Sequence, residues 1–142
     1  MSERNYTRKA KRVDNGEWVT GYLLRGGVTG QYFIHASGNS VNESDKVNEE
    51  GCLRFVAFEI NPDTICEPTG ITNDNGKLIW ENDIIRYDFI GATGKVVYLQ
   101  DRGWFAVEDV ARGIQYYDEK LWKNVEVIGN SFDNAELLEV EE

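Results

Sequence analysis

The sequence predicts a mainly β fold: a small β-barrel or sandwich made of two packed β sub-units, with only short helical turns. Two observations lead to this prediction. Short runs rich in β-branched and aromatic residues recur along the 142-residue chain, and Gly, Asn and Asp turn signals separate them. Apolar residues nowhere keep a helical period for three turns. Short strands at such spacing are typical of small barrels and sandwiches.

The composition is that of a globular protein with one domain or two small sub-domains. Hydrophobic residues make up 41% of the chain and aromatic residues 12%, which is enough for a buried core. No apolar run approaches the ~18 residues of a membrane span, and residues 1–12 are polar and basic, unlike a secretory signal. Cys52 and Cys66 fit no metal-ligand spacing. We therefore expect a cytoplasmic protein with reduced thiols and no membrane partner.

The first sub-unit is expected to begin with a hairpin over residues 12–28. An Asp-Asn-Gly turn at residues 14–16 precedes residues 18–24, which are rich in β-formers. Two glycines make the next turn, and the apolar run at residues 31–35 predicts another short strand.

Two interruptions follow in the middle of the chain. Ser, Asn, Asp and Glu dominate residues 36–51, which we therefore predict to be a loop. Residues 53–60 alternate well enough for a strand, and Pro62 ends it because proline has no N–H to donate to a ladder. The boundary between the sub-units is expected near one of these interruptions.

The second sub-unit is organised around residues 68–98. Asn75 and Gly76 signal a tight hairpin turn, because both residue types tolerate a positive φ. An apolar run at residues 78–80 predicts a strand, and the polar residues 81–83 predict a corner after which the chain re-enters the core.

Residues 84–107 follow the order strand, glycine-rich loop, strand, turn and strand, which suits an SH3-like, partly closed barrel. The turn at residues 100–103 is a clear hairpin signal. One helical turn is expected at residues 118–122. A closing strand and a short helix are expected within residues 125–138.

The chain thus divides into a basic N-terminal arm at residues 1–12, an N-terminal β sub-unit at residues 13–60 and a C-terminal β sub-unit at residues 61–142. The arm carries five basic side chains and one acid, net +4; because the whole chain carries −10, the remaining 130 residues carry −14. A body this acidic repels phosphate backbones, which argues against ordinary duplex binding.

This charge asymmetry allows two specific functional interpretations and one plain interpretation. Either the arm contacts nucleic acid, or the acidic body imitates nucleic acid and inhibits a host nucleic-acid-binding protein. The plain interpretation, which we favour, is a solvated surface that keeps the protein soluble. The candidate nucleic-acid-binding residues are Arg4, Arg8, Lys9, Lys11 and Arg12.

The loop from Gly91 to Lys95 does not match a phosphate-binding loop. That pattern needs a glycine where Phe89 stands and a serine or threonine where Val96 stands. A strand rather than a helix is also predicted to follow, so no helix N-terminus would face the anion.

His35 is the only histidine, so no site can be built from several histidines. A nucleophile made of Cys52 or Cys66 with His35 stays open but is disfavoured, since neither cysteine has an activating neighbour in the sequence.

Glu81 and Asp83 form the most specific acidic pair, because positions two apart on an extended chain face the same side. Such a pair can bind a cation or divide acid and base roles. Corner acids more often accept hydrogen bonds from backbone N–H groups, and we favour that role. We therefore predict no catalytic residue, no metal ligand and no cofactor, and thus no enzyme.

Most aromatic residues fall within the predicted strands. We expect them to pack in the core or in an oligomer interface. Stacking of bases is less favoured, because stacking platforms normally sit among basic residues, which are sparse beyond residue 12.

Two motifs of the chain resemble a known family. The core motif has two parts: residues 69–77 read TGITNDNGK and residues 79–85 read IWENDII. The closing motif, Glu126–Asn130, reads EVIGN. In this order they are similar to the YopX family, whose core reads T-G-x-x-D-x-N-G-K-x-I-[YW]-E-G-D-I-[VI] and whose members close with E-V-I-G-N. Residues 15–23 are also family-like, so the resemblance spans almost the whole chain.

Three positions depart from the family pattern. Asn73 stands where the family mostly has Asp, Asn82 where it mostly has Gly, and Ala135 where Pro is common. Asn tolerates the left-handed backbone conformation, so we expect Asn82 to preserve the corner.

The resemblance implies a phage or prophage origin, a β-rich fold and a location in the cytoplasm of the bacterial host, and it brings no catalytic residue to this chain. We expect a non-enzymatic, self-associating binding module: a homo-oligomer held by strand edges or exposed aromatic residues, with a host or phage protein as a further partner. The alternatives are a nucleic-acid contact through the basic arm and an acidic inhibitor of a host nucleic-acid-binding protein.

Overall fold

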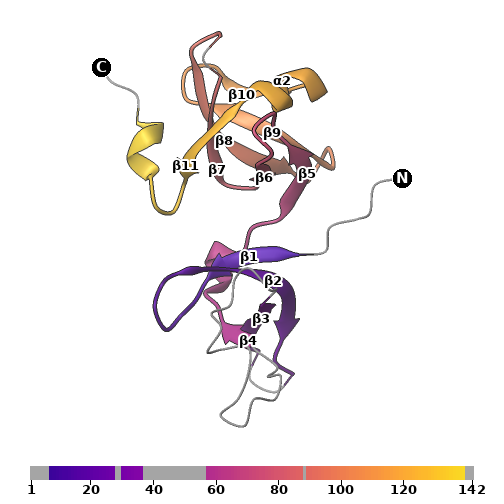
Figure 1. The fold of residues 1–142 in the computed structure, drawn as a ribbon, viewed down its shortest axis with the longest axis vertical. Helices are drawn as coiled ribbons and strands as arrows, with labels where there is room; N and C mark the ends of the chain where they lie inside the picture. The colour runs from indigo at the N-terminus through magenta and orange to yellow at the C-terminus, as the bar shows by residue number, and fades with distance from the viewer. Residues whose placement is uncertain (1–6, 28–29, 37–56, 88, 140–142) are drawn as a thin grey trace. The chain divides into compact units, whose positions relative to one another are not determined.

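The computed structural model describes residues 7–27, 30–36, 57–87 and 89–139. The chain divides into two compact units, Met1–Glu67 and Pro68–Glu142, and each is described by itself (Figure 1). Antiparallel strands make up most of the described chain, which confirms the predicted mainly β fold.

Four antiparallel strands form the sheet of the N-terminal unit, in the order β1-β2-β3-β4. They are β1 (Arg8–Lys11), β2 (Trp18–Arg25), β3 (Tyr32–Ala36) and β4 (Ala57–Glu59). The first hairpin is present, but its first strand lies before residue 12. The segment that forms β1 contains one apolar residue, Ala10, so hydrophobic alternation gives no strand signal there. Apart from Ala36, the predicted loop at residues 36–51 lies outside the described residues.

The core of the N-terminal unit forms on one face of this sheet. Ala10 and Val19 are directly opposite each other on β1 and β2. Both are buried, together with Ile34 from β3 and Ile60 just after β4. Because side chains alternate along a strand, this register places the buried residues Ala10, Val19 and Ile34 on the same side of the sheet.

The outer edge of β1 is covered by the end of the same unit. An isolated bridge joins Arg12 to Ile60, and another joins Lys9 to Cys66. In the second bridge, the Lys9 N–H donates to the Cys66 carbonyl at 3.2 Å, and the Cys66 N–H donates to the Lys9 carbonyl at 2.8 Å. An uncovered strand edge is a template for pairing with another chain, and β1 therefore does not offer one over this stretch.

The predicted break at Pro62 is one turn of 3-10 helix, η2 (Pro62–Thr64). Pro62 stands at the start of the turn, where a missing N–H costs little. The Asn61 side chain caps the turn by accepting a hydrogen bond from the Asp63 N–H at 3.0 Å. This turn lets the chain reach the edge of β1.

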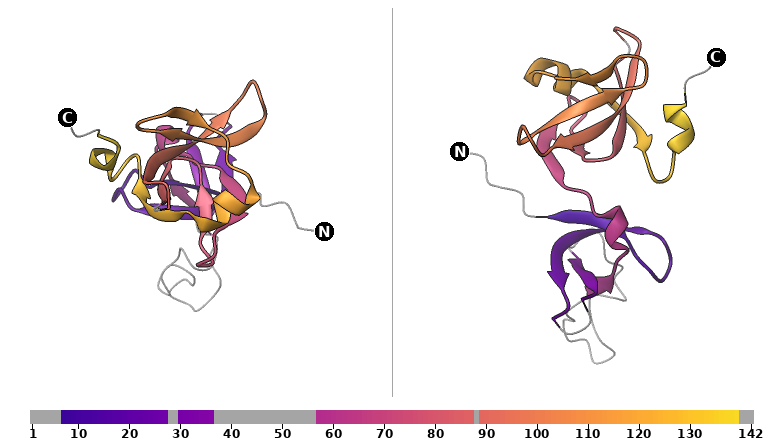
Figure 2. Two further views of the ribbon diagram at one scale, coloured as in Figure 1. Left: turned by 90° about the horizontal axis from the view of Figure 1, so that it is seen from above. Right: turned by 180° about the vertical axis from the view of Figure 1, so that it is seen from behind.

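The C-terminal unit contains an open five-stranded sheet and a separate two-stranded sheet, and its strands run side by side in Figures 1 and 2. The large sheet has the order β10-β9-β8-β7-β11. Its strands are β7 (Asp83–Tyr87), β8 (Ala92–Leu99), β9 (Trp104–Asp109), β10 (Gly113–Gln115) and β11 (Glu126–Asn130). The small sheet pairs β5 (Pro68–Thr72) with β6 (Leu78–Trp80).

Two short helical segments complete this unit, as the sequence predicted. The helix α2 (Glu119–Asn124) begins where Asp118 caps it, with the Leu121 N–H donating to the Asp118 carboxylate at 2.9 Å. The 3-10 turn η3 (Ala135–Leu138) follows the closing strand β11.

The core of the C-terminal unit lies between its two sheets and α2. Ile79 from the small sheet packs with Ile85 and Val96 from the large sheet, and Trp122 from α2 joins them. The arrangement is a small sandwich. The large sheet is open, with β10 and β11 at its two edges, so the described strands form no closed barrel.

The corner at residues 81–83 has the geometry that the sequence predicted. Asn82 adopts a φ of 71°, the one positive φ of a residue other than glycine in the described chain. Asp83 is buried, and its carboxylate accepts a hydrogen bond from the Trp80 N–H at 2.9 Å. Asn82 therefore takes the left-handed conformation that favours glycine or asparagine, and Asp83 fixes the corner.

Candidate functional site

A groove of about 920 Å³ lies within the C-terminal unit. Residues 69–72 of β5 line one side of it, and the start of β9, the segment after β10 and α2 line the rest. Five of the lining side chains are aromatic: Trp104, Phe105, Tyr116, Tyr117 and Trp122. Ligand pockets typically have volumes of about 300–1,000 Å³ and mostly apolar walls, so this groove is the best candidate binding site among the described residues.

Trp104 and Tyr116 present the most exposed aromatic surface of the groove. Their side chains are 48% and 56% exposed. The two rings meet edge to face, with centroids 6.0 Å apart and an interplanar angle of 88°, a geometry that stabilises aromatic pairs. The Arg102 guanidinium lies 6.0 Å from the Trp104 ring. An aromatic surface that stays exposed to solvent in this way is typical of an interaction site.

The deeper part of the groove is a second aromatic pair. Trp122 is only 3% exposed, and its ring centroid lies 5.4 Å from that of Tyr117. The Tyr117 hydroxyl is buried and has no hydrogen-bond partner among the described residues. Burial disfavours the phenolate and raises the pKa of Tyr117 above its ordinary value of 10.0, and the Asp109 carboxylate adds to this effect.

This buried hydroxyl predicts a loss of stability in alkali. The pKa of Tyr117 is higher in the folded state than in the unfolded state, so folding favours the neutral phenol. The stability that this difference supplies is therefore complete below pH 10 and is lost as the pH rises through the folded-state pKa. Tyr117→Phe should remove that loss. It should also raise the free energy of unfolding at pH 7 by about 1 kcal/mol, because a buried unpaired hydroxyl is destabilising.

Urea unfolding at pH 7 and above pH 10 checks both effects. Tyr116→Phe is the matched control, because it removes an exposed hydroxyl from the neighbouring residue; it should leave the free energy of unfolding at pH 7 unchanged. A drop in stability for Tyr117→Phe at pH 7 would mean that the hydroxyl has a partner in solution.

The charges at the groove balance each other. On α2, the Lys123 ammonium lies 3.2 Å from the Glu119 carboxylate, one helical turn apart. Arg102 adds one positive charge beside Trp104. The rim thus lacks the strong negative charge of the whole chain, which is −10. Apolar contacts and hydrogen bonds therefore dominate what this groove offers to a ligand.

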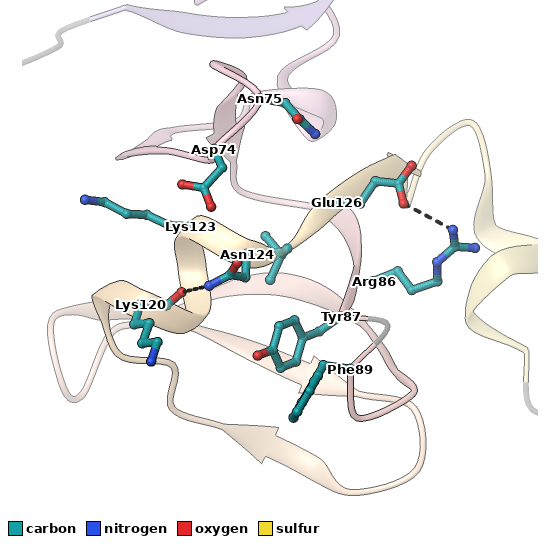
Figure 3. A pocket seen from close by; sticks show the side chains of 10 residues that line it. Asp74, Asn75, Arg86, Tyr87, Phe89, Lys120, Lys123, Asn124 and Glu126 are labelled. Carbon is teal, nitrogen blue, oxygen red and sulfur yellow. Dashed lines mark hydrogen bonds and ion pairs between the residues drawn. The ribbon is translucent and has the colours of Figure 1, made fainter.

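A second hollow of about 620 Å³ lies in the same unit and is more polar. Figure 3 shows the side chains that line it, and the Tyr87 and Phe89 rings stand side by side there, with centroids 6.2 Å apart. Arg86 is paired with Glu126 at 3.1 Å across β7 and β11. Phe89 projects from the β7–β8 hairpin and is 88% exposed.

The predicted nucleic-acid-binding residues belong to the N-terminal unit. Arg4 lies outside the described residues; Arg8, Lys9 and Lys11 are in β1, and Arg12 follows it. Arg8 is paired with Glu67 at 3.2 Å, and Arg12 with Asp14 at 2.6 Å. Arg8 and Arg12 therefore already have an acidic partner.

Lys9 and Lys11 share one aromatic neighbour. Their ammonium groups lie 5.0 and 5.6 Å from the centre of the Trp18 ring, and Lys11 is directly opposite Trp18 in the pairing of β1 with β2. Because residues two apart in a strand face the same side, both lysines and the ring lie on one face of the sheet.

The other residues that could carry chemistry take part in the structure of the sheet and its turns. The buried Cys66 thiol donates a hydrogen bond to the Thr64 carbonyl at 3.3 Å, His35 is paired with Tyr22 and Ala57 in the sheet, and Cys52 lies outside the described residues. Of the stretch predicted not to bind phosphate, residues 92–95 belong to β8, where Gly94 pairs with Ile85. In the described part of the chain, no three His, Cys, Asp or Glu side chains gather as metal ligands would.

The groove itself was missed by the sequence reasoning, which assigned the aromatic residues to a core or an oligomer interface. One feature of the sequence could have indicated the groove. Tyr116 and Tyr117 lie outside every predicted strand and directly precede Asp118, the cap of α2. Two large aromatic residues in a connecting segment need either a core or a partner to cover them.

Comparison with known proteins places the chain in a family. No curated protein matches it. Among the helices of the described residues, none has the length and apolar character needed to cross a membrane. The family model described as YopX protein matches residues 27–139, which include both the core motif at residues 69–85 and the closing motif Glu126–Asn130. The chain therefore belongs to the YopX family.

Proposed function

We propose that the protein is a non-enzymatic, self-associating binding module that takes its partner in the aromatic groove of the C-terminal unit. The observation that carries this proposal is the exposed Trp104–Tyr116 pair above a groove of about 920 Å³. Aromatic residues are enriched in the centres of protein interfaces, where they supply most of the binding energy. The phage or prophage origin and the cytoplasmic location expected from the sequence are part of the same proposal.

The groove supports binding better than catalysis. No histidine or cysteine is among the residues that line it. Its acid and its base, Glu119 and Lys123, are paired with each other on the surface of α2. Covalent catalysis needs a nucleophile that an adjacent base activates, and the one acid–base pair among the lining residues is an exposed ion pair on the surface of α2.

A nucleic-acid contact through the N-terminal segment is the second candidate. The observation that favours it is the position of Lys9 and Lys11 on the same sheet face as Trp18, since single-strand binders combine basic side chains with an aromatic surface for stacking. An acidic inhibitor of a host nucleic-acid-binding protein is a third candidate, and it is supported by the net charge of −10.

A pull-down from a lysate of the bacterial host, at low and at high salt, tests these candidates. The native chain is compared with Trp104→Ser/Tyr116→Ser, and Tyr22→Ser is the matched control because Tyr22 is a similarly exposed aromatic residue of the N-terminal unit. We expect the groove variant to lose the captured protein, the control to keep it, and salt to have little effect. Circular dichroism verifies that each variant is folded.

The other outcomes assign a different function. Capture that survives in the groove variant would rule out the groove as the binding site. Nucleic acid that is captured by the native chain and lost from Lys9→Glu/Lys11→Glu would support the second candidate. A basic host protein that high salt releases from every variant would support the acidic inhibitor.

A further inference from the structure

The most exposed large hydrophobic residue of the described chain is Phe89. Its side chain is 88% exposed, and that of the adjacent Ile90 is 46% exposed. Both lie at the tip of the hairpin that joins β7 to β8, and Figure 3 shows Phe89 at the edge of its hollow beside Tyr87. Two adjacent apolar side chains at a hairpin tip form a small projecting apolar surface, which is typical of a binding contact. We call Phe89 and Ile90 the apolar tip.

The apolar tip is held in place by hydrogen bonds. The Ile90 N–H donates to the Tyr87 carbonyl at 3.3 Å, and the Arg112 guanidinium donates to the Ile90 carbonyl at 3.4 Å. Arg112 is fixed in turn by the buried carboxylate of Asp109 at 3.3 Å. The turn between β9 and β10 therefore supports the tip, and a partner would meet a surface that is already ordered, which favours binding.

The groove and the apolar tip are two surfaces of the same unit. Phe89 is too exposed to fill the groove of its own chain. Each copy of the protein thus carries one open groove and one apolar tip. We propose that a second copy of this chain occupies the groove, with its Phe89 and Ile90 packed against Trp104 and Tyr116. This inference rests on the proposed function and names the partner in it.

The chemistry of the two surfaces is complementary. A phenyl ring can pack edge to face or offset against Trp104 and Tyr116, as aromatic pairs do. The groove volume of about 920 Å³ admits two side chains of this size. Arg112 beside the tip and Glu119 at the rim of the groove have opposite charges; both are well exposed, and each also has a partner in its own chain, Asp109 and Lys123. Opposite charges at the edge of an apolar contact favour one orientation of docking.

The contact joins two different surfaces of the chain. Two copies can exchange tips in a closed two-fold dimer, or the contact can repeat head to tail and leave one tip and one groove unfilled at the ends of an open assembly, which then closes into a ring or grows into a filament. A dimer in which one surface meets the same surface of its partner, tip on tip or groove on groove, would behave differently on mixing. This difference makes the proposal testable without knowledge of any other partner.

Sedimentation velocity of two complementary variants tests the inference. Phe89→Ser/Ile90→Ser removes the tip, and Trp104→Ser/Tyr116→Ser removes the groove contacts; all four side chains are exposed or half-exposed, so both variants should fold, as circular dichroism would verify. The native chain is expected to associate increasingly from micromolar to millimolar concentration. Each variant alone is expected to lose this association, while the control Tyr22→Ser/Leu24→Ser, exposed residues of the N-terminal unit, retains it.

An equimolar mixture of the two variants shows whether the tip of one copy binds the groove of another. One intact tip and one intact groove remain in the mixture, so it should form a heterodimer and nothing larger. A native chain that stays monomeric at millimolar concentration would overturn the inference, and so would a mixture that stays monomeric.

The same variants separate this inference from the proposed function. If the native chain is monomeric but the groove variant loses the protein captured from the lysate, the groove is a binding site with another occupant. If the variant keeps that protein as well, both proposals fail.

Discussion

Trp122→Ala is expected to lower the free energy of unfolding of the C-terminal unit by about 3–5 kcal/mol. The Trp122 side chain is almost fully buried and packs in the core with Ile79 and Ile85, which belong to different sheets. Trp122 is the only residue of the described helix α2 whose side chain is buried, so removing its indole takes away the contact of α2 with the core. The space left among the core side chains of both sheets can close only in part, so the loss should lie within this range. Urea unfolding followed by circular dichroism measures it.

Trp104→Ala is the matched control for this prediction. Trp104 lines the same groove but is 48% exposed, so its removal should cost less than about 1 kcal/mol. Equal losses for the two variants would contradict the division of the groove into a buried floor and an exposed aromatic pair. The contrast also explains why Trp104 and Tyr116, rather than Trp122, are the residues to change when binding is measured.

Asn73→Ala is expected to lower the free energy of unfolding by about 3 kcal/mol, because three hydrogen bonds of a buried amide are lost. The Asn73 amide oxygen accepts the N–H groups of Asn75 and Lys77 at 3.1 and 3.0 Å. Its amide nitrogen donates to the Val125 carbonyl at 3.1 Å. One side chain thus holds the turn between β5 and β6 and ties that turn to the end of α2. Chemical denaturation of the variant and the native chain measures the difference.

Two further variants show which of these hydrogen bonds matter. Asn75→Ala changes an exposed side chain in the same turn and should alter the free energy of unfolding by less than about 0.5 kcal/mol. Asn73→Asp keeps the two acceptor interactions but replaces the donor with a carboxylate oxygen that faces the Val125 carbonyl. It should therefore cost less than Asn73→Ala but more than the control. A native-like stability of Asn73→Asp would show that the bond to Val125 contributes nothing.

Local turn chemistry made much of the C-terminal unit predictable. Asn75 and Gly76 marked the β5–β6 turn, and Asn82 marked the corner that now shows a φ of 71°. The strands without such signals were harder to find. In β1 a basic sequence surrounds the single buried residue Ala10, and β10 is only three residues long. Both are strands because a neighbouring strand offers hydrogen bonds, which no local pattern records.

The groove was not predicted from the sequence, although its aromatic residues were singled out. The aromatic residues were expected in a core or an interface. In the structure Trp122 is buried in the core, while Trp104 and Tyr116 are exposed. Sequence could not make this distinction, because the same residue types serve in both places. It also could not bring Trp104 to Tyr116, since the rest of β9 and all of β10 lie between them and only the antiparallel pairing of these strands closes the distance.

The bridges that cover the edge of β1 determine how the N-terminal segment can be studied. Deleting residues 1–12 would remove β1 together with the buried Ala10, and it would leave both β2 and the segment that ends at Cys66 without their neighbour. A truncated chain would therefore unfold or aggregate in its N-terminal unit, whatever the segment binds. The segment cannot be treated as a removable appendage. Its charge must be changed in place, at Lys9 and Lys11, if a loss of binding is to be distinguished from a loss of structure.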